Sequence, residues 1–217
     1  MPDSTVDSKA DGRLARGLRT RTAVLDAAVA LATSRGLDGL SLGQLAEQLG
    51  QSKSGLFAHW RSKEDLQLAT VERAREQWVE RVVAPALGAP RGVRRLWALH
   101  EKRIAFYAAR VLPGGCFFAN TGFEYNARSG LVHDQLVAAL DDWMKLIERL
   151  ATEAVVAGEL SPAADPLQLA FEIDAAGVAM VYKSRLSDPA VAWARSRAAV
   201  LTRLRALCPD PALLPES

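Results

Sequence analysis

The helical spacing of its apolar residues is the feature that most constrains this chain. Between Thr22 and Arg35 apolar side chains recur three and four positions apart, and the same period returns in each strong segment that follows. No stretch alternates convincingly with period two, and no unit of about 20–50 residues repeats. The sequence therefore predicts an all-α fold, with helices over residues 22–35, 42–49, 53–60, 63–83, 92–111, 131–157, 166–186 and 189–207 and a short segment over 116–125.

The ends of these expected helices carry clear local signals. Ser41 and Gln44 form a capping box, in which both side chains bond to free backbone amides of the first turn. Gly50 can take the left-handed conformation that ends the helix over residues 42–49. Further N-caps are expected at Ser62, Asp165 and Asp188, the last two directly before a proline.

Positive charge is concentrated near the N-terminus. The 217 residues carry a net charge of only +2. Residues 9–63 nevertheless hold nine Lys and Arg against four Asp and Glu, whereas residues 64–217 hold eighteen against nineteen. An excess of basic residues at one end predicts that this end binds a polyanion such as DNA.

Residues 42–60 have the anatomy of a helix-turn-helix. Ala46 is small enough to let two helices cross closely, and Gly50 permits the sharp turn between them. The residues expected to face inward are Leu45, Leu49, Leu56 and Trp60. The second helix is then left with Lys53, Ser54, Phe57 and Ala58 facing outward, which suits a helix lying in a major groove. A helix-turn-helix can also serve as a structural or protein-docking element, and that alternative stays open.

Two segments together resemble a known family. The run SLGQLAEQLGQSKSGLFAHWRSKEDL, residues 41–66, resembles the DNA-binding domain of the tetracycline-repressor (TetR) family, and RTAVLDAAVALATSRG, residues 21–36, resembles that family's first helix. The stretch PGGCFFANTGFE, residues 113–124, is similar to a stretch found in some members. The resemblance implies a homodimeric DNA-binding transcriptional regulator whose C-terminal domain binds a small molecule.

The resemblance also implies roles for particular residues. Ser52, Lys53, Ser54 and Gly55 fall where members of the family approach base edges, and Ser41, Phe57, His59 and Lys63 fall where they meet phosphates. We add Arg19 and Arg21, which belong to the basic segment ahead of the first helix. Two positions depart from the family pattern: Phe57 stands where tyrosine is common, and Gln51 where an apolar residue is common.

The expected organisation is a disordered tail over residues 1–12, a helix-turn-helix DNA-binding domain over 13–62, and a helical ligand-binding and dimerisation domain over 63–217. In the last domain, aromatic residues cluster between Trp97 and Trp143, interleaved with polar ones. Such a mixture is typical of ligand pockets. We therefore expect a site for an apolar or aromatic molecule formed by Trp97, His100, Tyr107, Phe117, Phe118, Asn120, Glu124 and Trp143. Glu124 would favour a cationic or hydrogen-bond-donating ligand. The alternative is that these rings simply fill the core.

The last two helices are expected to form a dimer interface. Residues 169–182 are apolar on almost every side, so one buried face cannot account for them. The final helix carries two apolar stripes, which suggests one for the core and one for a partner. The resemblance implies the same arrangement of four helices, two from each chain. The expected interface residues are Phe171, Ala175, Val178, Tyr182, Trp193, Val200 and Leu204.

Other classes of protein find less support. The three histidines lack metal-ligand spacing, and no phosphate-binding loop or nucleophile elbow occurs, so we expect no metal, no cofactor and no catalysis. Two cysteines, a polar N-terminus and the lack of a long apolar run indicate a reduced cytoplasmic protein that does not enter membranes. The leading hypothesis is a repressor released from a palindromic operator by a small ligand. A ligand-independent DNA-binding or protein-docking module and a helical enzyme are the alternatives.

Overall fold

The computed structural model describes residues 5–50, 52, 56 and 59–216, with side chains from residue 17 onward. The described helices are α1 (Thr5–Arg35), α2 (Leu42–Leu49), α4 (Lys63–Trp78), the π-helical turn η1 (Val79–Val83), α5 (Ala84–Leu87), α6 (Val93–Ala108), α7 (Phe117–Tyr125), α8 (Leu131–Val156), α9 (Pro166–Leu186), α10 (Pro189–Leu207) and the 3₁₀ turn η2 (Pro211–Leu213). The described residues contain no strand, so the predicted all-α fold is confirmed.

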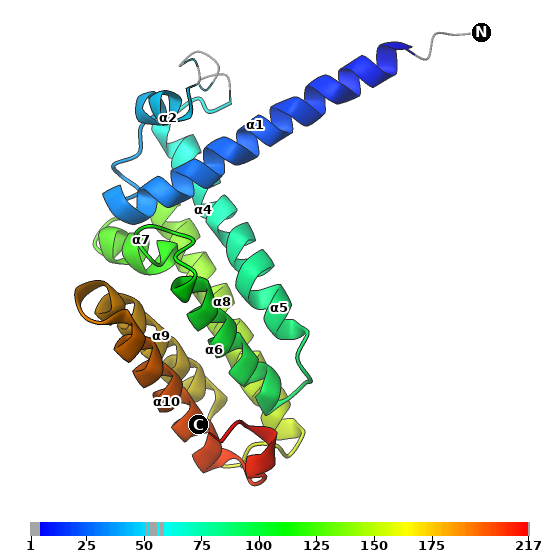
Figure 1. Ribbon diagram of the computed structural model, residues 1–217, viewed down its shortest axis with the longest axis vertical. Coiled ribbons are helices and arrows are strands. Elements are labelled where there is room, and N and C mark those ends of the chain that lie inside the picture. The colour runs from blue at the N-terminus through cyan, green and yellow to red at the C-terminus, as the bar shows by residue number, and fades with distance from the viewer. Residues whose placement is uncertain (1–4, 51, 53–55, 57–58, 217) are drawn as a thin grey trace.

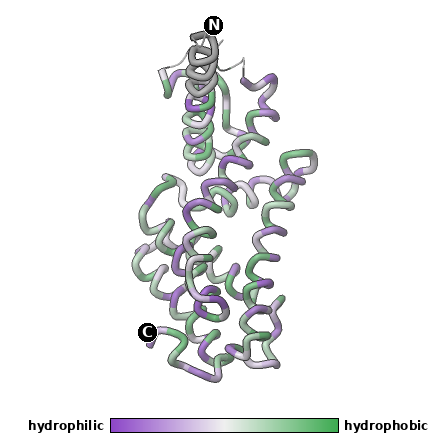
Figure 2. The backbone as a smooth tube through the Cα atoms, turned by 90° about the vertical axis from the view of Figure 1, so that its right-hand side faces the viewer, coloured by the Kyte–Doolittle hydropathy of each residue, from purple (hydrophilic) through white to green (hydrophobic). Residues whose placement is uncertain are grey.

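The helices form a small N-terminal unit above a larger helical body (Figure 1). α1 extends from the upper end as a long arm, and α4 runs from this end into the body. α6, α8, α9 and α10 run side by side below, where α9 packs against both α8 and α10. Polar and apolar positions alternate along the helices (Figure 2), as expected where each buries one side and exposes the other.

The predicted capping residues occupy their expected positions. Ser41 Oγ accepts a hydrogen bond of 3.2 Å from the Gln44 amide, and Gly50 ends α2 with a left-handed φ of 61°. The N-cap predictions at Ser62, Asp165 and Asp188 are likewise confirmed, because each side chain accepts a bond from an amide in the first turn of its helix. Local sequence therefore sets these helix boundaries.

Two expectations about helix extent are wrong. Residues 5–12, expected to be disordered, are helical, because α1 begins at Thr5 rather than at Thr22. Residues 5–21 contain no proline, so the backbone can continue as one helix into residues 22–35. The helix expected to end near Val83 instead continues through the π-helical turn Val79–Val83 to Leu87. Pro85 lacks an amide hydrogen, so the bonding register changes just ahead of it.

The core of the helical body lies between α6, α8, α9 and α10. Leu96, Ile147, Leu169 and Leu204 are fully buried there, and each such side chain contributes about 1.5–3 kcal/mol relative to an exposed one. α7 packs against α1 on one side and α8 on the other, so it connects the N-terminal unit to the body. In the described part of the chain, no helix combines the length and apolar character needed to cross a membrane.

Candidate DNA-binding and ligand-binding sites

The predicted helix-turn-helix agrees with the structure at the residues that are described, whereas most of its second helix, expected over residues 53–60, lies outside them. Leu45, Leu56 and Trp60 are buried, as predicted for inward-facing residues, and Leu49 packs against the same core. Trp60 lies next to α1, because the Arg21 guanidinium sits 5.7 Å from its ring centroid. This cation–π contact joins the basic segment of α1 to the helix-turn-helix.

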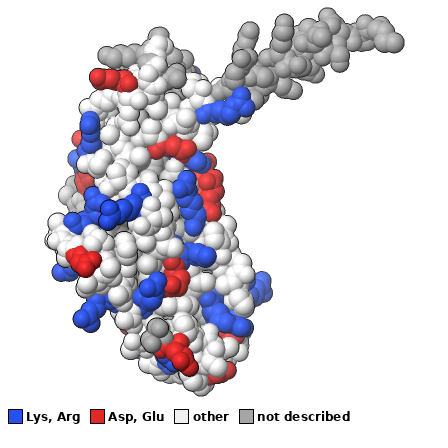
Figure 3. Space-filling model, in the orientation of Figure 1, with Lys and Arg blue, Asp and Glu red and all other residues white. Residues whose placement is uncertain are grey.

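The predicted DNA-contact residues fall into two groups. Arg19, Arg21, Ser41, Ser52 and His59 are exposed, and basic side chains lie where α1 leaves the body (Figure 3). Lys63 is also exposed, and its Nζ forms a 2.8 Å ion pair with Asp38. The predicted base-reading and backbone residues Lys53, Ser54, Gly55 and Phe57 lie outside the described residues.

A large cavity opens in the helical body. Its volume is about 920 Å³, and residues of α4, η1, α6, α7, α8 and α9 line it. That volume is within the range of about 300–1,000 Å³ usual for small-molecule sites. Three predicted ligand residues line it, namely Tyr107, Phe118 and Trp143. Trp78 and the first and last residues of the π-helical turn, Val79 and Val83, also line it and were not among the predicted ligand residues.

Five predicted ligand residues are absent from the cavity lining, which corrects the expectation for them. Phe117 is in the core, and Trp97 is half-buried with its ring 6.1 Å from the His100 ring. His100 is buried beside Ser196, whose Oγ lies 3.3 Å from Nε2, and burial lowers the pKa of His100 to about 3. Asn120 and Glu124 face α1 instead, because α7 turns that side toward the N-terminal unit.

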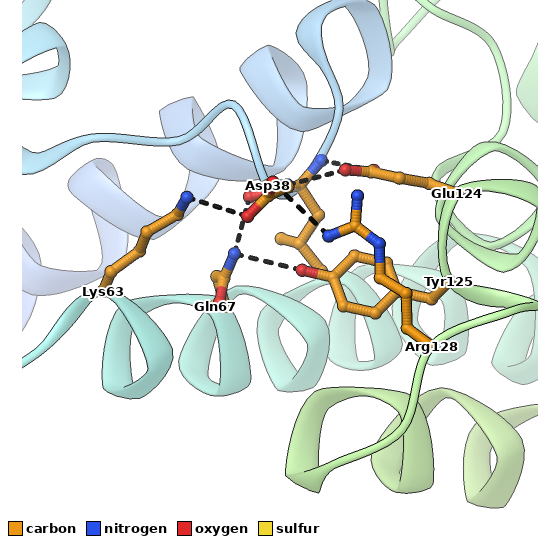
Figure 4. Close-up of polar contacts among 7 residues, drawn as sticks. Asp38, Lys63, Gln67, Glu124, Tyr125 and Arg128 are labelled. Carbon is orange, nitrogen blue, oxygen red and sulfur yellow. Dashed lines mark hydrogen bonds and ion pairs between the residues drawn. The ribbon is translucent and has the colours of Figure 1, made fainter.

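Glu124 joins α7 to the end of α1 (Figure 4). Its two carboxylate oxygens accept hydrogen bonds of 2.7 and 2.8 Å from the backbone amides of Leu37 and Asp38. Asn120 adds bonds of 2.8 Å to the Thr33 carbonyl and 3.0 Å to the Gly114 carbonyl. One side of α7 is therefore fastened to the N-terminal unit.

Further polar contacts complete this junction (Figure 4). Asp38 pairs with Lys63 at 2.8 Å and with Arg128 at 3.4 Å, and the bond from Lys63 holds the pKa of its carboxyl below the usual value. Gln67 of α4 donates to the Leu37 carbonyl and to the Tyr125 hydroxyl, both at 3.1 Å. We call the contacts among residues 37–38, Lys63, Gln67, Glu124, Tyr125 and Arg128 the α7 junction.

A buried arginine that was not among the predicted ligand residues also lines the cavity. Arg103 of α6 is 3% exposed, and its Nη1 donates a 3.1 Å bond to Asp174 Oδ1. The same oxygen accepts a 2.8 Å bond from Trp143 Nε1, and the guanidinium lies 5.4 Å from the Trp143 ring centroid. Arg103 follows Leu96 and His100 at helical spacing. This spacing places a charged residue on the apolar side of α6, and that unusual position could have identified Arg103 from the sequence.

Some of the predicted dimer residues are exposed and others are buried. Phe171, Ala175 and Tyr182 are exposed on α9 as expected. Val200 and Leu204 are buried in the chain's own core, so their assignment to the interface is wrong, and Val178 lines the cavity. Trp193 is half-buried against the core. Leu167 and Leu186, which were not predicted, extend the exposed apolar stripe, and we call Leu167, Phe171, Ala175, Tyr182 and Leu186 the α9 face.

A helix-turn-helix near the N-terminus and a ligand-sized cavity in the helical body define a DNA-binding transcriptional regulator. The chain belongs to the TetR family. The model of bacterial regulatory proteins of the tetR family matches residues 24–70, and the model of the tetracyclin repressor-like C-terminal domain matches residues 92–200. The second match includes α6, α7, α8 and α9, which contribute most of the cavity lining.

Individual relatives agree with this assignment. The HTH-type transcriptional regulator SrpR of Pseudomonas putida is 26% identical over 146 residues, which span 65% of this chain and 63% of SrpR. The HTH-type transcriptional repressor ComR of Escherichia coli (strain K12) is 25% identical over 151 residues, 69% of this chain and 72% of ComR. A TetR transcriptional regulator from Chloroflexus aurantiacus J-10-FL superposes with a TM-score of 0.81 at 27% identity, covering 89% of this chain and 98% of that one.

Proposed function

We propose that this regulator is a homodimeric repressor that binds a near-palindromic operator and is released from it by a small molecule entering the cavity. The main support for this proposal is that residues of α7 belong both to the cavity lining and to the α7 junction. Phe118 and Tyr125 line the cavity, while Glu124 and Tyr125 belong to the α7 junction. A ligand that displaces α7 would therefore disturb the support of the DNA-binding unit.

The energetics of this coupling follow from the junction contacts. Hydrogen bonds to a charged carboxylate are worth about 1.5–3 kcal/mol each, and Glu124 accepts two of them. Two states of the DNA-binding unit that differ in these bonds can thus differ by a few kcal/mol. A ligand shifts the balance between them only by its difference in affinity for the two states.

Selection of bound fragments from random DNA tests the DNA-binding part of the proposal. We expect an inverted repeat whose half-sites lie about 34–36 Å apart, one for each recognition helix of a dimer. Affinity should fall steeply as salt rises, because phosphate contacts release counterions. Recovery of no enriched sequence would contradict the proposal.

Lys53→Ala is expected to weaken operator binding by about 1–3 kcal/mol and to relax the preference at one base pair, because the resemblance places Lys53 at base edges. Lys63→Ala is the matched control. It is expected to weaken binding to operator and unrelated DNA alike, since a phosphate contact carries no sequence information. Fluorescence anisotropy with both DNAs measures the two effects. An unchanged base preference in Lys53→Ala would contradict the assigned recognition face.

The α9 face supports the dimer. Leu167, Phe171, Tyr182 and Leu186 are 58–69% exposed and lie at helical spacing on one side of α9. A continuous apolar stripe of this kind marks an interaction surface. Because a two-fold interface uses the same patch on both chains, α9 and α10 of two copies can form a four-helix arrangement.

Phe171→Asp is expected to weaken the dimer by about 2 kcal/mol or more, because the interface would bury an unpaired carboxylate. Leu87→Asp on α5 is the matched control, since α5 lies at the opposite edge of the body (Figure 1) and Leu87 is also exposed. Sedimentation equilibrium measures both variants. Equal dissociation constants would show that the interface lies elsewhere.

A further inference from the structure

Arg103 lines the cavity, and several of its N–H donors have no hydrogen-bond partner among the described residues. Arginine has five N–H donors, and within the described part of the chain only Nη1 makes hydrogen bonds, to the side chain and the carbonyl of Asp174. Nε is enclosed and has no partner there. Nε and Nη2 form one edge of the guanidinium, and that edge matches the two oxygens of a carboxylate.

The fold makes specific room for this guanidinium. A Cβ placed on Gly177 of α9 would lie 2.0 Å from Arg103 Nη1 and 2.6 Å from Nε, so only glycine fits here without moving the arginine. The helix backbone therefore lies directly against the charged group. Asp174 accepts a bond from Nη1, and Nε has no hydrogen-bond partner among the described residues.

Tyr107 supplies a second unused donor at the same place. It is 8% exposed, it lies one helical turn from Arg103 on α6, and it lines the cavity. Its hydroxyl lies near Arg103 and the Cys116 thiol but has no partner at hydrogen-bonding geometry among the described residues. Burying a hydroxyl without a hydrogen-bond partner is unfavourable. A ligand oxygen that accepts a bond from this hydroxyl would therefore bind more tightly.

The charge of the lining favours an anion. Arg75, Arg103, Lys145 and Arg149 line the cavity against only Asp142 and Asp174. Both acidic groups have basic partners, since Asp142 pairs with Arg75 and Asp174 with Arg103. Lys145 pairs with Asp141, which does not line the cavity, so the basic residues still exceed the acidic ones in the lining itself. The rest of the wall is largely apolar and includes Trp78, Phe118, Leu136, Leu140 and Val178. The sequence-based expectation of a cationic ligand rested on Glu124. Both carboxylate oxygens of Glu124 instead accept hydrogen bonds in the α7 junction.

We propose that the cavity binds an amphipathic carboxylate. Its carboxylate lies on the Nε–Nη2 edge of Arg103 and accepts a bond from the Tyr107 hydroxyl, and its apolar body lies against the aromatic and aliphatic wall. This inference rests on the proposed function, because it names the ligand class of the same regulatory cavity. It assigns Arg103 and Tyr107 as the residues that select the head group.

Matched probes test the assignment on the protein without DNA. Dodecanoate, dodecanol and dodecylamine share one apolar body, and naphthylacetate and naphthylethanol form an aromatic pair. Isothermal titration is expected to give a dissociation constant at least about tenfold lower for a carboxylate than for its uncharged or cationic partner in at least one series. Equal binding within both series, or no saturable binding by either carboxylate, would overturn the proposal.

Substitutions identify the residues that hold the head group. Arg103→Met is expected to remove the carboxylate preference and leave the affinity for the alcohol nearly unchanged. Arg149→Met is the control, because it removes a basic lining residue that is exposed, and it should change affinity by less than about twofold. Tyr107→Phe should reduce carboxylate affinity several-fold, and it carries the test if Arg103→Met does not fold. Loss of the preference in Arg149→Met alone would overturn the assignment.

Operator release is measured separately, by anisotropy of labelled operator DNA with and without the carboxylate. Selective carboxylate binding with no release would contradict the proposed function and leave the ligand class intact. Release by the alcohol and the carboxylate at equal concentrations, with equal affinities, would overturn the ligand class and leave the proposed function intact.

Discussion

Gly114→Ala is expected to destabilise the protein by about 3 kcal/mol, because no side chain fits at this position. A Cβ on Gly114 would lie 1.7 Å from the Thr33 carbonyl oxygen and 2.2 Å from its carbonyl carbon, both backbone atoms of α1. The Gly114 amide also donates a 2.9 Å bond to Thr33 Oγ1. Accommodating a methyl group requires α1 to move away from the segment that leads into α7.

Denaturant unfolding and thermal melting measure this effect, with an expected fall in Tm of about 6–12 °C for a chain of this size. Gly122→Ala in α7 is the matched control. A Cβ there meets no atom within 4 Å, and alanine favours a helix over glycine by about 0.5–1 kcal/mol. The control should therefore be as stable as the wild type or slightly more stable. Equal stability of Gly114→Ala and the wild type would contradict the observed approach of the two backbones.

Acidification is expected to destabilise the protein through His100. Burial, together with the charge of Arg103, lowers the pKa of His100 from 6.5 to about 3, and its Nδ1 is enclosed without a partner in the described part of the chain. The imidazole is therefore neutral in the folded protein, whereas the unfolded chain gains a proton below pH 6.5. Stability is complete above that pH and is lost as the pH falls toward 3.

The loss attributable to His100 is about 2–3 kcal/mol between about pH 7 and pH 4.5. Urea unfolding of the wild type and of His100→Leu across this range isolates it, because carboxyl groups titrate in both proteins. The variant should show the shallower fall in unfolding free energy, whatever its stability at neutral pH. Parallel curves for the two proteins would show that His100 is not held neutral by burial.

Features that depend on nearby residues could be predicted from the sequence. Ser41, Ser62, Asp165 and Asp188 cap their helices as expected, and Gly50 adopts the left-handed conformation. The burial of Leu45, Leu56 and Trp60 also agrees with the spacing of apolar residues along the segment 42–60. Each of these features is decided within a turn or two of the chain, where spacing fixes which groups can meet.

The direction in which a helix faces is a different matter, and α7 illustrates it. The spacing of Asn120 and Glu124 correctly predicts that they share one side of the helix. That side contacts α1 and residues 37–38, whereas Phe118 lines the cavity. Both sides carry aromatic and polar residues, so the sequence offers no means of telling which one borders the cavity.

The sequence by itself determined the helical class, the caps of α2, α4, α9 and α10, the place of the helix-turn-helix and the family, since these rest on local spacing and on a contiguous motif. The tertiary structure alone decided the cavity, the α7 junction and the burial of Val200 and Leu204 in the chain's own core. It also brought Arg103 together with Asp174 and Gly177, which lie more than seventy residues away along the chain. Such contacts depend on how whole helices pack, and helix packing is set by the complementary shapes of many side chains rather than by any one segment.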